Sequence, residues 1–131
     1  LQSQVLVGNT SDNPPSGLDP CNGVFDGPGE WIRYEPWCTG DITVSTCNPG
    51  TSFDTMLTVL KWGFDSNCWS TVVDCNDDQW STGCELNGLF RKSRVVFDAE
   101  PNAVYYIVVT GFNGASGPYE LSIEAPECPG P

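Results

Sequence analysis

Short runs of alternating apolar and polar residues follow one another along the whole chain, and clusters of Gly, Pro, Asn and Asp separate them. This pattern is typical of an antiparallel all-β sandwich. No segment keeps a period of 3.6 residues over three helical turns, so we expect very little helix. The pattern predicts about eight strands, near Gln4–Val7, Trp31–Glu35, Asp41–Cys47, Thr55–Trp62, Thr71–Asp74, Leu89–Phe97, Val104–Phe112 and Tyr119–Glu124.

Two of these strands divide cleanly into an inward and an outward face. In the strand at 41–47 the apolar face carries Ile42, Val44 and Thr46. In the last strand the inward face carries Tyr119, Leu121 and Ile123. The segment 104–109 is apolar on both faces, which predicts a central position in its sheet.

The chain of 131 residues is long enough for one domain with a real core. Residues 1–20 are expected to form an N-terminal strand and a flexible linker, residues 21–125 the sandwich, and residues 126–131 a Pro-rich tail or linker. No run of apolar residues approaches the length of a membrane span, so we expect no direct insertion into a bilayer.

The chain is strongly acidic, with a net charge of −12 from 17 acidic and 5 basic residues. Nucleic acids and anionic lipid surfaces would be repelled, whereas divalent cations and neutral partners fit this charge. An equally open interpretation is that the acidity only keeps a secreted protein soluble.

Seven cysteines in a chain this short indicate disulfides and an extracellular or cell-surface location. A zinc site is the rival interpretation, but the chain has no histidine and no Cys-x-x-Cys pair. The odd count leaves one thiol over, and Cys128 in the tail is the natural candidate. Asn9-Thr10-Ser11 is a sequon, which predicts a glycan on Asn9 and fits the same secretory route.

Carboxylate and amide side chains gather in and around one short segment. The group consists of Asp54, Asp74, Asn76, Asp77 and Asp78. Calcium is bound by six to eight such oxygens, so the group predicts a calcium site. The alternative is that Asp54 and Asn76 cap turns while Asp77 and Asp78 are simply solvated.

The sequence offers no catalytic apparatus. Because the chain has no histidine, Ser–His–Asp and Cys–His arrangements are excluded. The same carboxylates would serve a glycosidase only if two of them faced one cleft, one with a raised pKa, and nothing in the sequence indicates that. We therefore expect a protein that is not an enzyme.

Five tryptophans are many for this length. Trp31 lies within a predicted strand and is expected in the core. The other four lie at strand ends or in loops, and they are Trp37, Trp62, Trp69 and Trp80. Flat, amphipathic rings stack on sugars or anchor protein interfaces, although they also serve to cover the ends of a sandwich. Trp80 is the strongest partner-facing candidate, because no strand pattern recruits it inward.

Several of these segments together resemble the bacterial pre-peptidase C-terminal domain family, in its Cys-rich secreted form. They are Trp31-Ile32-Arg33-Tyr34, Thr43-Val44-Ser45-Thr46-Cys47, Phe53-Asp54-Thr55-x-Leu57-x-Val59, Cys75-Asn76-Asp77-Asp78 and the final hairpin from Tyr105 to Leu121. The resemblance implies a jelly-roll-like sandwich that accompanies other domains without catalysing a reaction. Some relatives bind matrix protein, polysaccharide or calcium.

Three cysteine pairs are predicted, one from closeness in the sequence and another from what the family resemblance implies. Cys68 and Cys75 flank the strand at 71–74 closely enough to close a hairpin. Cys47 and Cys84 adjoin segments that the family places together, and Cys21–Cys38 is the third expected pair. The loop 79–91 and the aromatic segment 62–69 depart from the family pattern, so ligand preference is expected to differ there.

The function expected from the sequence is structural or adhesive, as a subunit of a surface or fibrous assembly of protein copies. In such a polymer the segment Leu1–Val7 is either kept in its own sheet or donated to a neighbouring subunit. The alternative is a carbohydrate- or matrix-protein-binding accessory module of a secreted hydrolase.

Overall fold

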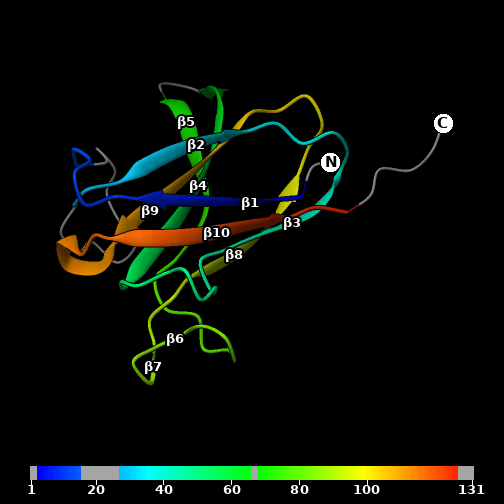
Figure 1. Ribbon diagram of the computed structural model, residues 1–131. Helices are drawn as coiled ribbons and strands as arrows, with labels where there is room; N and C mark the ends of the chain where they lie inside the picture. The colour runs from blue at the N-terminus through cyan, green and yellow to red at the C-terminus, as the bar shows by residue number, and fades with distance from the viewer. Residues whose placement is uncertain (1–2, 16–26, 66–67, 127–131) are drawn as a thin grey trace.

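The computed structural model describes residues 3–15, 27–65 and 68–126, and of these 63–65 and 68–71 by their backbone alone. The described residues are all-β, with antiparallel strands stacked as two sheets (Figure 1). The first sheet has the order β1 (Gln4–Asn9), β10 (Pro118–Glu124), β3 (Gly40–Ser45), β8 (Arg94–Ala99). The second has the order β2 (Glu30–Tyr34), β9 (Tyr105–Gly111), β4 (Thr55–Asp65), β5 (Cys68–Asn76). The predicted fold class is confirmed.

A small hairpin and one helical turn stand outside the two sheets. The hairpin pairs β6 (Glu85–Leu86) with β7 (Leu89–Phe90) and projects from the sandwich (Figure 1). Its connection, Asn87-Gly88, has φ values of 53° and 85°, which suits a two-residue hairpin turn because Asn and Gly tolerate positive φ. The turn is the 3-10 element η2 (Phe112–Gly114), directly after β9.

The core lies between the sheets and is built by the alternation that the sequence predicts. Ile42 and Val44 of β3 are 1% and 0% exposed, and the inward set of β10 (Tyr119, Leu121 and Ile123) is equally buried. Each such side chain contributes about 1.5–3 kcal/mol through its removal from water. β9 is paired on both sides, with β2 and β4, so its predicted central position is confirmed.

Three expectations about the strands are wrong in detail. The predicted strand Leu89–Phe97 is interrupted, because the backbone N–H groups of Arg91 and Lys92 turn away to the carbonyl of Cys84. The predicted strand Thr71–Asp74 is longer, spanning Cys68–Asn76. Trp31 is not a core residue. It lies on the face of β2 opposite Tyr34 and contacts the ring of Tyr106 edge-on at 5.9 Å.

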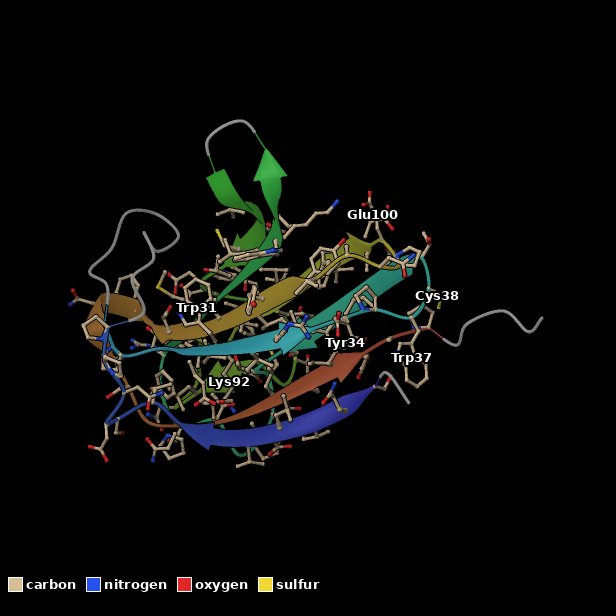
Figure 2. All side chains as sticks on the ribbon, turned by 90° about the horizontal axis from the view of Figure 1, so that it is seen from above. Trp31, Tyr34, Trp37, Cys38, Lys92 and Glu100 are labelled. Carbon is tan, nitrogen blue, oxygen red and sulfur yellow. A yellow bond between two sulfur atoms is a disulfide. The ribbon has the colours of Figure 1, made fainter. Side chains whose placement is uncertain are left out.

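Strand β1 pairs within its own chain, through six consecutive positions along β10. A close approach of Gly8 to Tyr119 and a hydrogen bond of Thr10 position the strand there. A Cβ on Gly8 would lie 2.5 Å from the hydroxyl of Tyr119, so only glycine lets β1 pass over that ring. Thr10 is fully buried, and its N–H donates to the carbonyl of Gly117 at 3.0 Å. Figure 2 shows β1 beside β10 at the margin of the sandwich.

Candidate functional site

One end of the second sheet brings together the acidic residues that surround β4 and β5. Asp54 precedes β4, and Asp77 and Asp78 follow β5. Because the two strands are antiparallel, with Leu57 opposite Asn76, the start of one meets the end of the other. η2 reaches the same place, since β9 also pairs with β4 and the N–H of Phe112 donates to the carbonyl of Asp54 at 2.9 Å.

A buried hydroxyl ties these segments together. The Ser93 Oγ lies 2.6 Å from the carbonyl oxygen of Thr55 and 2.7 Å from that of Asp77. Ser93 is itself fully buried, and in such surroundings an unsatisfied carbonyl costs about 1–3 kcal/mol. This hydroxyl therefore fixes the distance between the start of β4 and the end of β5, and with it the spacing of the carboxylates.

The three carboxylates of Asp54, Asp77 and Asp78 have oxygens within 4.8 Å of one another. The Oδ1 atoms of Asp54 and Asp77 are buried and have no hydrogen-bond partner among the described residues. Burial, and then the charge of Asp78, raises the pKa of Asp54 to about 6, although Arg91 opposes the shift. Burial and the charges of Asp78 and Asp54 raise the pKa of Asp77 to about 6. Arg91 lies 4.0 Å from the other Asp54 oxygen, Oδ2, and its charge does not cancel the effects of burial and of Asp78.

The two other predicted ligands are engaged elsewhere. The Asp74 Oδ1 accepts a hydrogen bond from the N–H of Cys75 at 2.8 Å. The Asn76 Oδ1 accepts from the N–H of Arg94 at 3.1 Å and so joins β5 to β8. Of the five residues predicted to form a metal site, the structure thus gathers three, and the Asn76 side chain joins two strands rather than capping a turn.

The long connection from β5 to β8 folds over this acidic end and is pinned in three places. The disulfide Cys47–Cys84 joins it to the chain just after β3, as the family resemblance implies. The carbonyl of Cys84 accepts hydrogen bonds from the N–H groups of Arg91 and Lys92, at 3.2 and 3.0 Å. The N–H of Gln79 donates to the carbonyl of Lys92 at 2.8 Å. These bonds give the loop a defined shape.

Between the loop and the acidic end lies a pocket of about 530 Å³ that is open to solvent, which we call the Trp80 hollow. It is lined by Asp54, Asp78, Trp80, Gly88, Leu89, Phe90, Arg91 and Phe112. The rings of Trp80 and Phe90 lie 5.6 Å apart with 32° between their planes, and Trp80 is 79% exposed. The Arg91 guanidinium lies 4.0 Å from the carboxylate of Asp54. Aromatic faces and hydrogen-bonding charged groups therefore share one concave surface.

Of the three tryptophans proposed as ligand-binding whose side chains the structure describes, Trp80 alone lines this hollow. Trp37 lies in the β2–β3 connection beside Cys38, at the end of the sandwich opposite η2 (Figure 2). Trp62 lies in β4 and packs edge-on against Tyr106 at 6.1 Å. Trp69 falls outside the described side chains. The structure therefore places Trp37 and Trp62, the other two tryptophans of this set with described side chains, outside the hollow that Trp80 lines.

Sequence reasoning missed the hollow's other main components. The sequence predicts Phe90 within the strand Leu89–Phe97, whereas it belongs to the short hairpin β6–β7. Arg91 enters the sequence analysis only as one of the five basic residues. Phe112 carried a usable signal, since a large aromatic residue directly before Asn113-Gly114 falls in a turn and is therefore exposed, here by 39%.

The remaining cysteines and the sequon are placed only in part. Cys38 and Cys75 are disulfide-bonded, and their predicted partners, Cys21 and Cys68, lie outside the described side chains. Cys128 lies outside the described residues. Asn9 is exposed at the end of β1, where its Oδ1 accepts from the N–H of Ser11 at 2.8 Å.

Comparison with known proteins supports the fold. The pre-peptidase C-terminal domain of collagenase from Bacillus anthracis is similar over 93% of this chain and 89% of that chain, with a TM-score of 0.53 and 18% identity. CorA, a surface-associated copper-binding protein of Methylomicrobium album BG8, is similar over 95% and 93%, with a TM-score of 0.48 and 9% identity. No protein-family profile matches the sequence, and no curated protein is significantly similar to it. The first similarity places the chain in the fold seen in pre-peptidase C-terminal domains.

Among the described residues no helix has the length and apolarity to cross a bilayer.

Proposed function

We propose that this chain is a non-catalytic extracellular module that binds carbohydrate in the Trp80 hollow. The observation that carries the proposal is the Trp80–Phe90 ring pair beside the Asp54, Asp78 and Arg91 side chains. An indole face removes the apolar C–H face of a sugar ring from water. Carboxylates accept hydrogen bonds from sugar hydroxyls, and a guanidinium donates to sugar oxygens.

The charge of the protein narrows the kind of carbohydrate. With a net charge of −12, the chain repels sulfated or uronate-rich polymers at long range. Of the described residues that line the hollow, Arg91 is the one with a positive charge, and Asp54 and Asp78 lie with it. A neutral polysaccharide is therefore the favoured ligand class.

The position of the two carboxyl groups with raised pKa values supports binding without hydrolysis. A glycosidase needs both of its carboxyl groups at the scissile bond. Asp54 lines the hollow together with Asp78, but its Oδ1 is buried and Asp77 does not line the hollow, so the two carboxyl groups with raised pKa values do not both face a ligand there.

Replacing Trp80 with alanine is expected to reduce polysaccharide binding about tenfold or more, since loss of a stacked ring removes on the order of 1.4 kcal/mol. The measurement is a pull-down on insoluble neutral polysaccharides, followed by titration calorimetry with the oligosaccharide of the best binder. Trp37→Ala is the matched control, because Trp37 is also exposed, by 65%, but lies away from the hollow. Equal losses in both variants, or no binding by the wild type to any neutral or charged glycan, would contradict the proposal.

We also propose that calcium binds at Asp54, Asp77 and Asp78. The support is the pair of buried Oδ1 atoms without partners, within a set of carboxylates that fits the oxygen preference of this ion. Bound calcium would reduce the repulsion among the three carboxylates. It would also fix the positions of Asp54 and Asp78, which line the Trp80 hollow.

A structural role in a surface or fibrous assembly is the second candidate function, and the position of β1 favours it. Among the described strands, β1 lies at the edge of its sheet and pairs only with β10, and of its six residues Leu6 and Gly8 alone are half-buried. In a polymer formed by strand donation, β1 of one copy would take this place against β10 of the next.

Deleting residues 1–9 is expected to leave single subunits in electron micrographs if copies are joined by strand donation, because each subunit loses the segment it donates. A synthetic peptide of residues 1–13 should then bind the truncated protein stoichiometrically, since the groove beside β10 is vacated. The same peptide carrying Gly8→Val should not bind, because its side chain meets Tyr119. Polymers that persist after the deletion would rule out strand donation.

A further inference from the structure

The edge strands of the two sheets are β1 and β8 in the first and β2 and β5 in the second. They differ in how they are protected against pairing with another molecule. Natural sheet edges carry charges, prolines or bulges that block such pairing. β2 carries Glu30 and Arg33, and β8 carries Arg94 and Asp98. β5 carries Asp74, and its pairing with β4 is irregular at two points. Each of these three edges is defended.

β1 has none of these protections. Its sequence, Gln-Val-Leu-Val-Gly-Asn, contains no charge and no proline, and its pairing with β10 runs through six positions without a shift in register. Val5 and Val7 are 61% and 79% exposed. In a chain with a net charge of −12, this edge is an uncharged strip at which two copies can approach without opposing like charges.

The hydrogen bonds of β10 show which backbone groups of β1 point outward. Thr10 and Gly117 form a bonded pair, and bonded and unbonded pairs alternate along antiparallel strands. Position 7 is therefore an unbonded pair with Glu120. In agreement, Glu120 directs its N–H to the Thr51 Oγ1 at 3.0 Å and its carbonyl to the Asn48 Nδ2 at 2.9 Å, on the side away from β1. The N–H and carbonyl groups of Val5 and Val7 face the outer edge, beyond which no strand of the described residues lies.

From this edge we infer that a second copy of the chain pairs with β1, antiparallel, edge to edge, with β1 retained in its own sheet. In an arrangement centred on Leu6, Val5 of one copy lies opposite Val7 of the other, and each pair exchanges two backbone hydrogen bonds. The sheet that contains β1 in one copy thereby continues into the same sheet of the other copy. The inference does not depend on carbohydrate binding, and it differs from strand donation, which uses the inner edge of β1 against β10.

The test compares Val7→Pro and Val7→Lys with the wild type by sedimentation over a range of concentrations. Proline at position 7 removes an outward N–H and leaves the bonded pairs at 6 and 8 intact, so the dimer should weaken about tenfold or more while the thermal unfolding midpoint changes little. Val7→Lys should weaken it similarly. Val96→Lys is the matched control, because Val96 is 50% exposed on the opposite edge strand and the change in net charge is the same.

The outcomes separate the alternatives. The dimer should also strengthen as salt is raised, since salt screens the repulsion between two acidic copies. A wild type that remains monomeric at every concentration and salt level overturns the inference. Association that survives both Val7 variants but is lost when residues 1–9 are deleted also overturns it and assigns strand donation instead. Equal weakening by Val7→Lys and Val96→Lys overturns it as well, because the effect would then follow charge alone.

Discussion

In buffer free of divalent cations, the free energy of unfolding should fall as the pH is raised from about 4 to about 8. The pKa values of Asp54 and Asp77 are both raised from 3.8 to about 6. The folded state therefore holds these protons more tightly than the unfolded state, and its advantage is lost as pH rises through the folded pKa. Each group alone would lower stability by on the order of 2 kcal/mol, and the pair by less than twice that, because each shift partly depends on the other's charge.

Urea denaturation at a series of pH values measures this effect, and two asparagine variants assign it. Asp77→Asn should gain stability at pH 8 and little or none at pH 4, since it removes a charge whose buried oxygen has no partner. Asp98→Asn makes the same chemical change on the exposed face of β8, outside the cluster, and should flatten the pH profile far less. A profile for Asp77→Asn that parallels that of the wild type would show that the cluster does not control stability.

The same experiment tests the calcium proposal. Calcium should raise the unfolding midpoint at pH 8 and have little effect at pH 4, where protons already occupy Asp54 and Asp77. Magnesium should be less effective, because it demands a stricter geometry and gives up its water reluctantly. If calcium leaves the midpoint unchanged at pH 8, while Asp77→Asn stabilises there, the raised pKa values stand and the metal assignment fails.

Removing the Cys47–Cys84 disulfide should cost about 4 kcal/mol, because the bridge closes a segment with a sequence separation of 37 residues in the unfolded chain. The double variant Cys47→Ala, Cys84→Ala should also lose polysaccharide binding. The bridge is one of three constraints on the loop that carries Trp80, and the carbonyl of Cys84 holds the N–H groups of Arg91 and Lys92.

Thermal unfolding and limited proteolysis together measure both parts of this prediction. Cleavage should appear first between residues 79 and 90, where the loop is released, while the sandwich resists longer. Val96→Lys serves as the folded control, because it alters an exposed side chain on β8. A double variant that unfolds at the wild-type midpoint and resists cleavage in the loop would show that hydrogen bonds alone hold the hollow.

The fold was predictable wherever alternation within a strand decides burial. Ile42 and Val44, or Leu121 and Ile123, can face only one way once the strand is recognised. The core position expected for Trp31 is wrong, because Trp31 and Ile32 are both apolar and alternation alone does not decide which of them faces inward. The break at 91–93 could not be predicted, since it follows from bonds to Cys84, which local sequence does not encode.

The candidate site shows the same division between local and distant causes. Trp80 was identifiable because no strand pattern recruits it. The separation of Asp74 from Asp54 could not be predicted, because it depends on which strand ends meet. It also depends on Ser93, in the connection just before β8, whose hydroxyl contacts the carbonyls of Thr55 and Asp77. Arg91, Phe90 and Phe112 come together only after the β5–β8 loop has closed over the sheet.

The β6–β7 hairpin has a practical consequence for engineering. Its tip, Asn87-Gly88, is exposed, pairs with nothing beyond its own two short strands, and contributes no residue to the hydrophobic core. A Cβ on Gly88 would meet no atom within 4 Å, so the surrounding space is open, although its positive φ limits direct substitution. Loops of this kind accept inserted peptides. The scaffold can therefore display foreign sequences, or carry a fluorophore, at the wall of the Trp80 hollow, which Gly88 lines, without repacking the hydrophobic core.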